Sequence, residues 1–143
     1  MLKYYIATSL TRAKHHNAIR DALNPDKFQL TYDWTEHGNI KSTSQDRLNT
    51  VAMNESQGIS QADILIVLLP GGFGTHVEIG LGIAANKTVI IHSEDAQVFL
   101  PCEKTCAFYH HDQVFQISCQ LESLPARIDN LVESLDLLCL LNE

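Results

Sequence analysis

Long apolar runs and basic residues are both scarce in this sequence. No apolar run approaches the roughly 20 residues that a membrane-spanning helix needs. Ten residues are Lys or Arg against 17 that are Asp or Glu, which gives a formal net charge of −7. This balance argues against a protein that holds long nucleic acid through its phosphates. We therefore expect a small-molecule partner, with no membrane and no long nucleic acid.

Features of secretion are missing as well. The amino terminus runs directly into a strand pattern and lacks the basic start, apolar stretch and cleavage site of a signal peptide. The four cysteines are Cys102, Cys106, Cys119 and Cys139. We interpret them as reduced thiols of a cytoplasmic protein. The spacing from the first two to His110 and His111 is not standard for zinc, so loop packing is a simpler account than a metal site. No cofactor is expected.

The chain is long enough for one core. With 143 residues, 45% of them apolar, and no linker or repeat, it is expected to form one domain over residues 1–143. Apolar patterns predict strands over 3–9, 28–34, 63–69, 88–93 and 114–118, and helices over 12–23, 44–58, 76–86 and 124–141. Their alternation predicts an α/β fold of three layers, with a parallel five-stranded, flavodoxin-like or Rossmann-like sheet.

Strand order decides where such a sheet binds its ligand. In the order 2-1-3-4-5 the first and third strands are neighbours, and the switch point lies between their carboxyl ends. Those ends hold Thr8 and Ser9 on one side and Pro70-Gly71-Gly72 on the other. The sequence therefore predicts a ligand site at this rim.

A glycine-rich turn follows the third strand. The run 63–69 has no polar alternation, as expected of a central strand that is covered on both faces. Gly71, Gly72 and Gly74 permit positive φ angles and close approach of a ligand. A helix that begins near Thr75 would aim free amides and its positive dipole end at the turn, which suits an anion or a polarised sugar. Small residues later in this helix, Gly80, Gly82, Ala84 and Ala85, are expected to let it lie close to the sheet.

Glu78 has two interpretations. Thr75 and Glu78 fit a capping box, in which both serve only to close the helix start. The alternative is a functional carboxylate, because the residue stands beside exposed glycine backbone at the end of a central strand. The helix dipole would then help to keep it ionised.

Glu55 lies on an apolar stripe with Leu48, Val51, Ala52 and Ile59, on a helix that we expect to stop near Gly58. A carboxylate on such a stripe either faces a cavity or reaches water from the edge of the stripe. The position of Glu55 along the helix also counts against a site role. It lies only about a turn and a half before the helix end, which places it toward the opposite rim of the sheet.

Three stretches carry a family resemblance: 5–9 (Tyr-Ile-Ala-Thr-Ser), 55–63 (Glu-Ser-Gln-Gly-Ile-Ser-Gln-Ala-Asp) and 74–80 (Gly-Thr-His-Val-Glu-Ile-Gly). Together they resemble the nucleoside 2-deoxyribosyltransferase family, which includes deoxynucleoside 5′-monophosphate N-glycosidases, over roughly residues 3–93. The resemblance implies cleavage or transfer at the N-glycosidic bond of a nucleoside or nucleotide. It also implies a homodimer or higher homo-oligomer.

Roles follow from the same resemblance. In that family a helix-borne Glu attacks C1′ of the sugar, a tyrosine of the first strand orients it, and an acid before the third strand contacts the base. By position these are Glu78, Tyr5 and Glu55. The reaction requires a carboxylate under the sugar and a proton donor or hydrogen bond at the base. The transferases also carry an Asp where this chain has Gly72, so we expect hydrolysis to compete well and a 5′-monophosphate to be preferred.

The expected substrate-binding residues are Thr8, Ser9, Trp34, Gly71, Gly72, Gly74, Thr75 and His76. Two of them have plain alternatives. Trp34 either stacks on a base or only packs in the core. His76 either contacts an anion or is simply solvated.

A second resemblance keeps the substrate open. Residues 70–78 also match the PGGxGTxxE signature of the cytokinin-activating phosphoribohydrolases, although those proteins are longer and this chain has no second glycine-rich phosphate loop. Both families cleave an N-glycosidic bond. A nucleotide-binding domain without catalysis is the remaining alternative, but an acid at position 78 disfavours pure anion binding.

Overall fold

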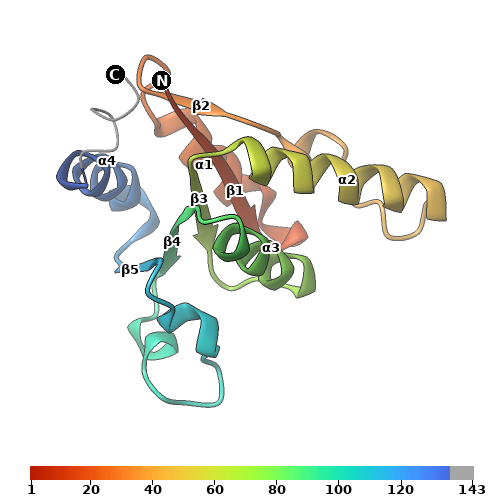
Figure 1. The fold of residues 1–143 in the computed structure, drawn as a ribbon. Coiled ribbons are helices and arrows are strands. Elements are labelled where there is room, and N and C mark those ends of the chain that lie inside the picture. Colours follow the sequence, from red (N-terminus) through yellow and green to blue (C-terminus); the bar gives the residue numbers. More distant parts are fainter. Residues whose placement is uncertain (136–143) are drawn as a thin grey trace.

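The sheet is parallel and has five strands. The structure is a computed structural model that describes residues 1–135, with strands β1 (Leu2–Thr8), β2 (Phe28–Leu30), β3 (Ile64–Leu68), β4 (Thr88–Ser93) and β5 (Val114–Ser118). They lie in the order β2-β1-β3-β4-β5 (Figure 1). Every residue of β3 is buried, as expected of a strand that is covered on both faces. The predicted fold and strand order are confirmed.

Four helices cover the sheet: α1 (Ala13–Ala22), α2 (Gln45–Gln61), α3 (Phe73–Ala84) and α4 (Leu124–Ser134). Helices α1 and α4 contribute to one apolar cluster and helices α2 and α3 to the other, so each pair covers one face of the sheet (Figure 1). Within residues 1–135, no helix combines the length and the apolar character that crossing a bilayer requires.

Several predicted boundaries were wrong. The second strand ends at Leu30, and Trp34 instead begins a 3-10 helix whose cap is the side chain of Asp33. The third helix begins at Phe73, earlier than predicted. Residues 94–112 are mostly irregular, as predicted, with two short 3-10 helices. The predicted closing helix is described as far as Ser134, and its last part lies outside the described residues.

Gly58 does not end a helix, contrary to expectation, but lies inside α2 and is buried. A Cβ there would stand 2.8 Å from Cβ of Tyr32 and 3.1 Å from the ring of Tyr5. The glycine is therefore needed for close packing. In α3 only Gly82 has this role, because a Cβ would lie 2.8 Å from Leu65, whereas Gly80 is exposed with open space beside it.

Helix α2 is long for its place in the fold. Its 17 residues span about 25 Å, against roughly 17 Å for the five residues of β3. The Ser44 hydroxyl accepts a hydrogen bond from the Arg47 amide and fixes where the helix begins. The first turns of α2 consequently extend past the carboxyl edge of the sheet (Figure 1) and form a wall above it.

Candidate functional site

A cavity of about 410 Å³ lies at the carboxyl ends of β1 and β3, between the first turns of α2 and α3. This is the predicted switch point. Eight of the predicted site residues line it: Thr8, Ser9, Trp34, Glu55, Gly72, Gly74, Thr75 and Glu78. Tyr5, Gly71 and His76 are not part of the lining, and each is accounted for below.

Glu78 lies in the second turn of α3 with 8% of its surface exposed. The pKa of this carboxyl group is raised to about 8, mainly by burial; the Tyr5 hydroxyl opposes this rise and the charge of Glu55 adds to it. The expectation that the helix dipole keeps Glu78 ionised is therefore wrong. The dipole acts within the first turn, and burial outweighs it here.

Tyr5 lies in β1 beneath Glu78 and is fully buried. Its pKa is raised above the usual range by burial and then by the negative charge of Glu78, so the hydroxyl keeps its proton. Among residues 1–135, neither this hydroxyl nor Oε2 of Glu78 has a hydrogen-bond partner of good geometry. The Tyr5 hydroxyl is thus a donor close to the Glu78 carboxyl group, beneath the cavity lining, without full hydrogen-bond geometry between them.

Glu55 lines the same cavity from α2 and is half-buried. The concern that it points to the opposite rim was wrong, because α2 overhangs the sheet and places this residue above the carboxyl edge. Burial raises the pKa of Glu55, and the nearby His37 lowers it by a smaller amount. Two acids with raised pKa values thus share one cavity.

The glycine turn is shaped by packing. None of its glycines has a positive φ, contrary to expectation, because among residues 1–135 the only such glycine is Gly38. Gly71 is required instead because a Cβ there would collide with the Thr75 side chain. A Cβ at Gly72 or Gly74 would meet nothing within 4 Å, so these two leave room for a ligand.

Thr75 and Glu78 do not form a capping box. Gly72 is the cap of α3, and its amide donates to Oγ1 of Thr75 at 3.2 Å. Thr75 therefore closes the helix start from within the first turn. The side chain of Glu78 is directed toward Tyr5 and is left for another role.

Trp34 is held as part of the wall. It is 4% exposed, its indole N–H donates to the Ile6 carbonyl at 2.8 Å, and the ring of His16 meets it edge-on at 5.1 Å. Packing is thus its main role, although Trp34 is among the residues that line the cavity.

His76 is partly exposed and does not line the cavity. Its Nδ1 lies 2.8 Å from the Gly72 carbonyl, and its Nε2 lies 2.7 Å from the Tyr109 hydroxyl. Tyr109 belongs to the 3-10 helix Ala107–His110 and packs edge-on against Phe99. His76 therefore ties the glycine turn to the segment that follows β4.

The comparison with protein families decides the identity. The family model described as "Nucleoside 2-deoxyribosyltransferase" matches residues 4–135. The chain belongs to the nucleoside 2-deoxyribosyltransferase family. This confirms the resemblance inferred from the three sequence stretches. At the level of the family, the chemistry is transfer or cleavage at the N-glycosidic bond.

Two solved structures resemble the fold of this chain. CMP N-glycosidase BcmB from Clostridium botulinum is 14% identical, with a TM-score of 0.59, and the match covers 89% of this chain and 98% of that one. A conserved protein from Enterococcus faecalis is 20% identical, with a TM-score of 0.60 and coverages of 91% and 98%. At these identities the likeness concerns the fold alone. A search of curated proteins finds no significant match.

Sequence reasoning missed much of the lining of this nucleoside 2-deoxyribosyltransferase cavity. The missed residues are Leu10, Thr11, His37, Asn39, Ile40, Lys41, Leu48, Val51, Ala52 and Phe73. Those on α2 share the apolar stripe of Glu55 and were interpreted as core. The segment 37–41 had one usable signal, which is that it follows β2 at the ligand-binding rim.

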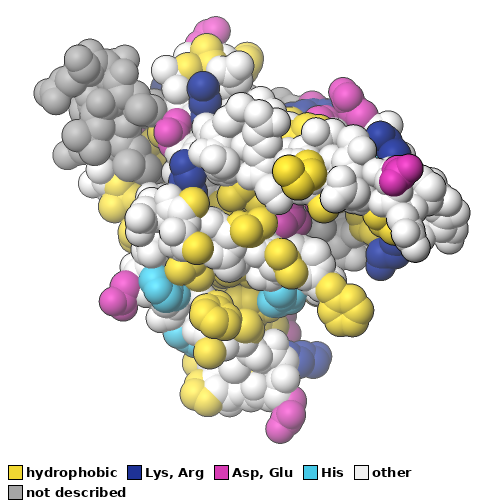
Figure 2. Space-filling model, turned by 45° about the vertical axis from the view of Figure 1, so that its right-hand side comes forward, with side chains coloured by type: hydrophobic (Ala, Val, Ile, Leu, Met, Phe, Trp, Pro, Cys, Tyr) yellow, Lys and Arg dark blue, Asp and Glu magenta, His cyan; other side chains and the backbone are white. Residues whose placement is uncertain are grey.

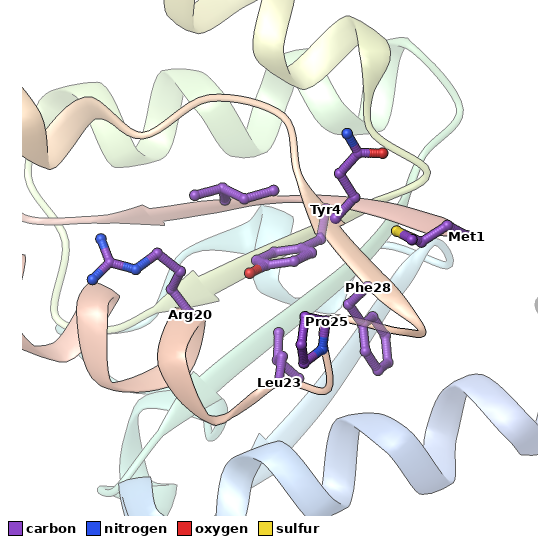
Figure 3. A pocket seen from close by; sticks show the side chains of 8 residues that line it. Met1, Tyr4, Arg20, Leu23, Pro25 and Phe28 are labelled. Atoms are coloured by element: carbon purple, nitrogen blue, oxygen red, sulfur yellow. The ribbon is translucent and has the colours of Figure 1, made fainter.

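Two other features are poorer candidates. A hollow of about 430 Å³ lies beside the amino-terminal halves of β1 and β2 (Figure 3). In the described part of the chain no carboxylate lines it, and Arg20 at its edge is paired with Asp21 and Asp33 at 2.9 and 2.6 Å. Within residues 1–135, no group of three or more His, Cys, Asp or Glu side chains could hold a metal ion.

Proposed function

We propose that the protein hydrolyses the N-glycosidic bond of a nucleoside 5′-monophosphate, with Glu78 as nucleophile. One observation carries the proposal. Glu78 is buried at the floor of a cavity, above the hydroxyl of Tyr5, with the second acid Glu55 in the same cavity. This arrangement provides a carboxylate for C1′ and a proton donor for the base.

The two acids divide the work. Each carboxylate disfavours ionisation of the other, so the pair is expected to retain one proton near neutral pH. Because burial raises the pKa of Glu78 more strongly, the resting pair holds this proton on Glu78. The productive form, reached when the proton passes to Glu55, has Glu78 ionised. Ionised Glu78 attacks C1′, the bond to the base breaks, and the base takes the proton of Glu55. Water then attacks C1′ of the glycosyl ester, gives its proton to Glu55 and releases Glu78.

Tyr5 assists through its position. As a protonated hydroxyl beneath Glu78, it can donate to the carboxylate and fix its rotamer before the attack. Because the hydroxyl has no other partner among residues 1–135, this interaction is available to it.

Two features support a 5′-phosphate. Lys41 is the single Lys or Arg side chain among the residues that line the cavity in the described part of the chain. A Cβ at Gly72 or Gly74 would meet nothing within 4 Å, which leaves room for an anion to approach the first amides of α3. Without these groups, the two acids of the cavity would disfavour a doubly charged substrate.

A reaction with two bases tests the proposal. The protein is incubated with a deoxynucleoside or its 5′-monophosphate and an excess of a different free base, and products are separated by chromatography. We expect free base and sugar phosphate to form from the monophosphate faster than any exchange product. Faster exchange, with nucleosides used as readily, would make the protein a transferase. Tight binding without turnover would leave a binding domain.

Replacing the nucleophile tests its role. Glu78→Gln keeps the volume but loses the attacking charge, so turnover should fall at least about a hundredfold while the fold is retained. The matched control is Glu103→Gln, which changes an exposed acid outside the cavity and should keep full activity. Near wild-type turnover of Glu78→Gln would end the assignment.

A further inference from the structure

Phe73 is the most exposed large apolar residue of the described chain, with 92% of its surface accessible. It is the first residue of α3 and lines the cavity that holds Glu78. Figure 2 shows apolar side chains on the surface around α2 and α3, the helices that form two walls of the cavity. An aromatic ring in this position leaves an apolar face for a ligand to cover.

The surroundings of the ring are open on the ligand side. Phe73 is flanked by Gly72 and Gly74, and a Cβ at either position would meet no atom within 4 Å. The hydrogen bond from the Gly72 amide to Thr75 fixes the backbone next to the ring. The ring thus projects from a rigid helix start into free space at the cavity mouth.

The opposite wall is aliphatic. Leu48, Val51 and Ala52 of α2 line the same cavity, and Leu48 is 40% exposed. Trp34 does not supply the open aromatic face, because it is almost fully buried and its N–H is bound to the Ile6 carbonyl. Phe73 is therefore the aromatic side chain of the cavity with a free face.

We propose that Phe73 stacks on the base of the bound nucleotide and closes it against the aliphatic wall of α2. The inference rests on the proposed function and adds a substrate-binding residue to it. A planar, aromatic leaving group matches the ring, and its polar edge then remains directed toward Glu55. Stacking depends little on which base is present, so Phe73 contributes affinity while other residues select the base.

The test measures binding without turnover. Dissociation constants of dCMP, dAMP and 2-deoxyribose 5-phosphate are determined by calorimetry in the Glu78→Gln background, with and without Phe73→Ala. We expect Phe73→Ala to weaken both nucleotides about tenfold or more, and to leave the sugar phosphate, which has no base, unchanged. Phe73→Trp should restore nucleotide binding.

Val77→Ala is the matched control, because Val77 is exposed on α3 one turn further on and does not line the cavity. It should not alter nucleotide binding.

Equal losses for nucleotide and sugar phosphate would overturn the inference. So would equal losses in Phe73→Ala and Val77→Ala together with a lower molecular mass. If the wild type binds through Phe73 but releases no base, the proposed function fails and the stacking role stands. If it turns over normally and Phe73→Ala binds normally, only the stacking role fails.

Discussion

Glu78 is an acid whose surroundings oppose its ionisation, and this affects stability as well as catalysis. Its pKa is about 8 in the folded protein, against 4.5 for the ordinary side chain. Between these values the folded state holds a proton that the unfolded state has lost, so the free energy of unfolding falls as the pH rises.

We expect the Tm of the wild type to fall more steeply between about pH 5 and about pH 8 than that of Glu78→Gln, which cannot ionise. Thermal unfolding followed by circular dichroism at fixed ionic strength measures both slopes. The same slope in both proteins would show that the Glu78 pKa is not raised.

Lys41 provides a second prediction for a single residue. Because it is exposed and lines the cavity mouth, Lys41→Gln should raise KM for a 5′-monophosphate by about threefold to tenfold and leave KM for the nucleoside unchanged. Steady-state kinetics with both substrates measure this difference. Lys104→Gln, an exposed lysine outside the cavity lining, is the control. Equal changes for both substrates would remove Lys41 from phosphate binding.

At the level of elements, two glycines inside helices make opposite predictions. Gly58→Ala forces a Cβ against Tyr32 and the ring of Tyr5, so it should lower the free energy of unfolding by about 1–2 kcal/mol and reduce kcat. The Cβ of Gly80→Ala meets open space, so this substitution should raise the free energy of unfolding by up to about 1 kcal/mol. Urea denaturation measures both. A stabilised, fully active Gly58→Ala would contradict the packing.

The sequence predicted elements better than contacts. Buried parallel strands leave a continuous apolar pattern, and the strand order placed Thr8 and Glu78 at one rim correctly. The height of Glu55 was misjudged because periodicity locates a residue around a helix, while its height over the sheet depends on how far α2 overhangs. The contact of Gly58 with Tyr32 joins segments far apart in the chain, and no local pattern records it.

The family match leaves the assembly of the whole molecule as a prediction. Apolar side chains that do not line the cavity are exposed on α2 and α3: Met53, Val77 and Leu81. We expect this surface to be covered in part by a second copy, which gives a dimer. Light scattering at micromolar concentration should give twice the chain mass, and Val77→Asp should reduce it to one chain. A fully active wild-type monomer would contradict the prediction.

The hydrogen bonds around His76 have a direction. A carbonyl oxygen can only accept, so Nδ1 of His76 must carry the hydrogen that binds Gly72. In the tautomer with its hydrogen on Nδ1, Nε2 accepts from the Tyr109 hydroxyl. The tautomer of this imidazole is thereby fixed by the turn itself. The nitrogen chemical shifts of His76 consequently report on the glycine turn. A ligand that moves Gly72 would change these chemical shifts, so its binding could be followed without labelling the ligand.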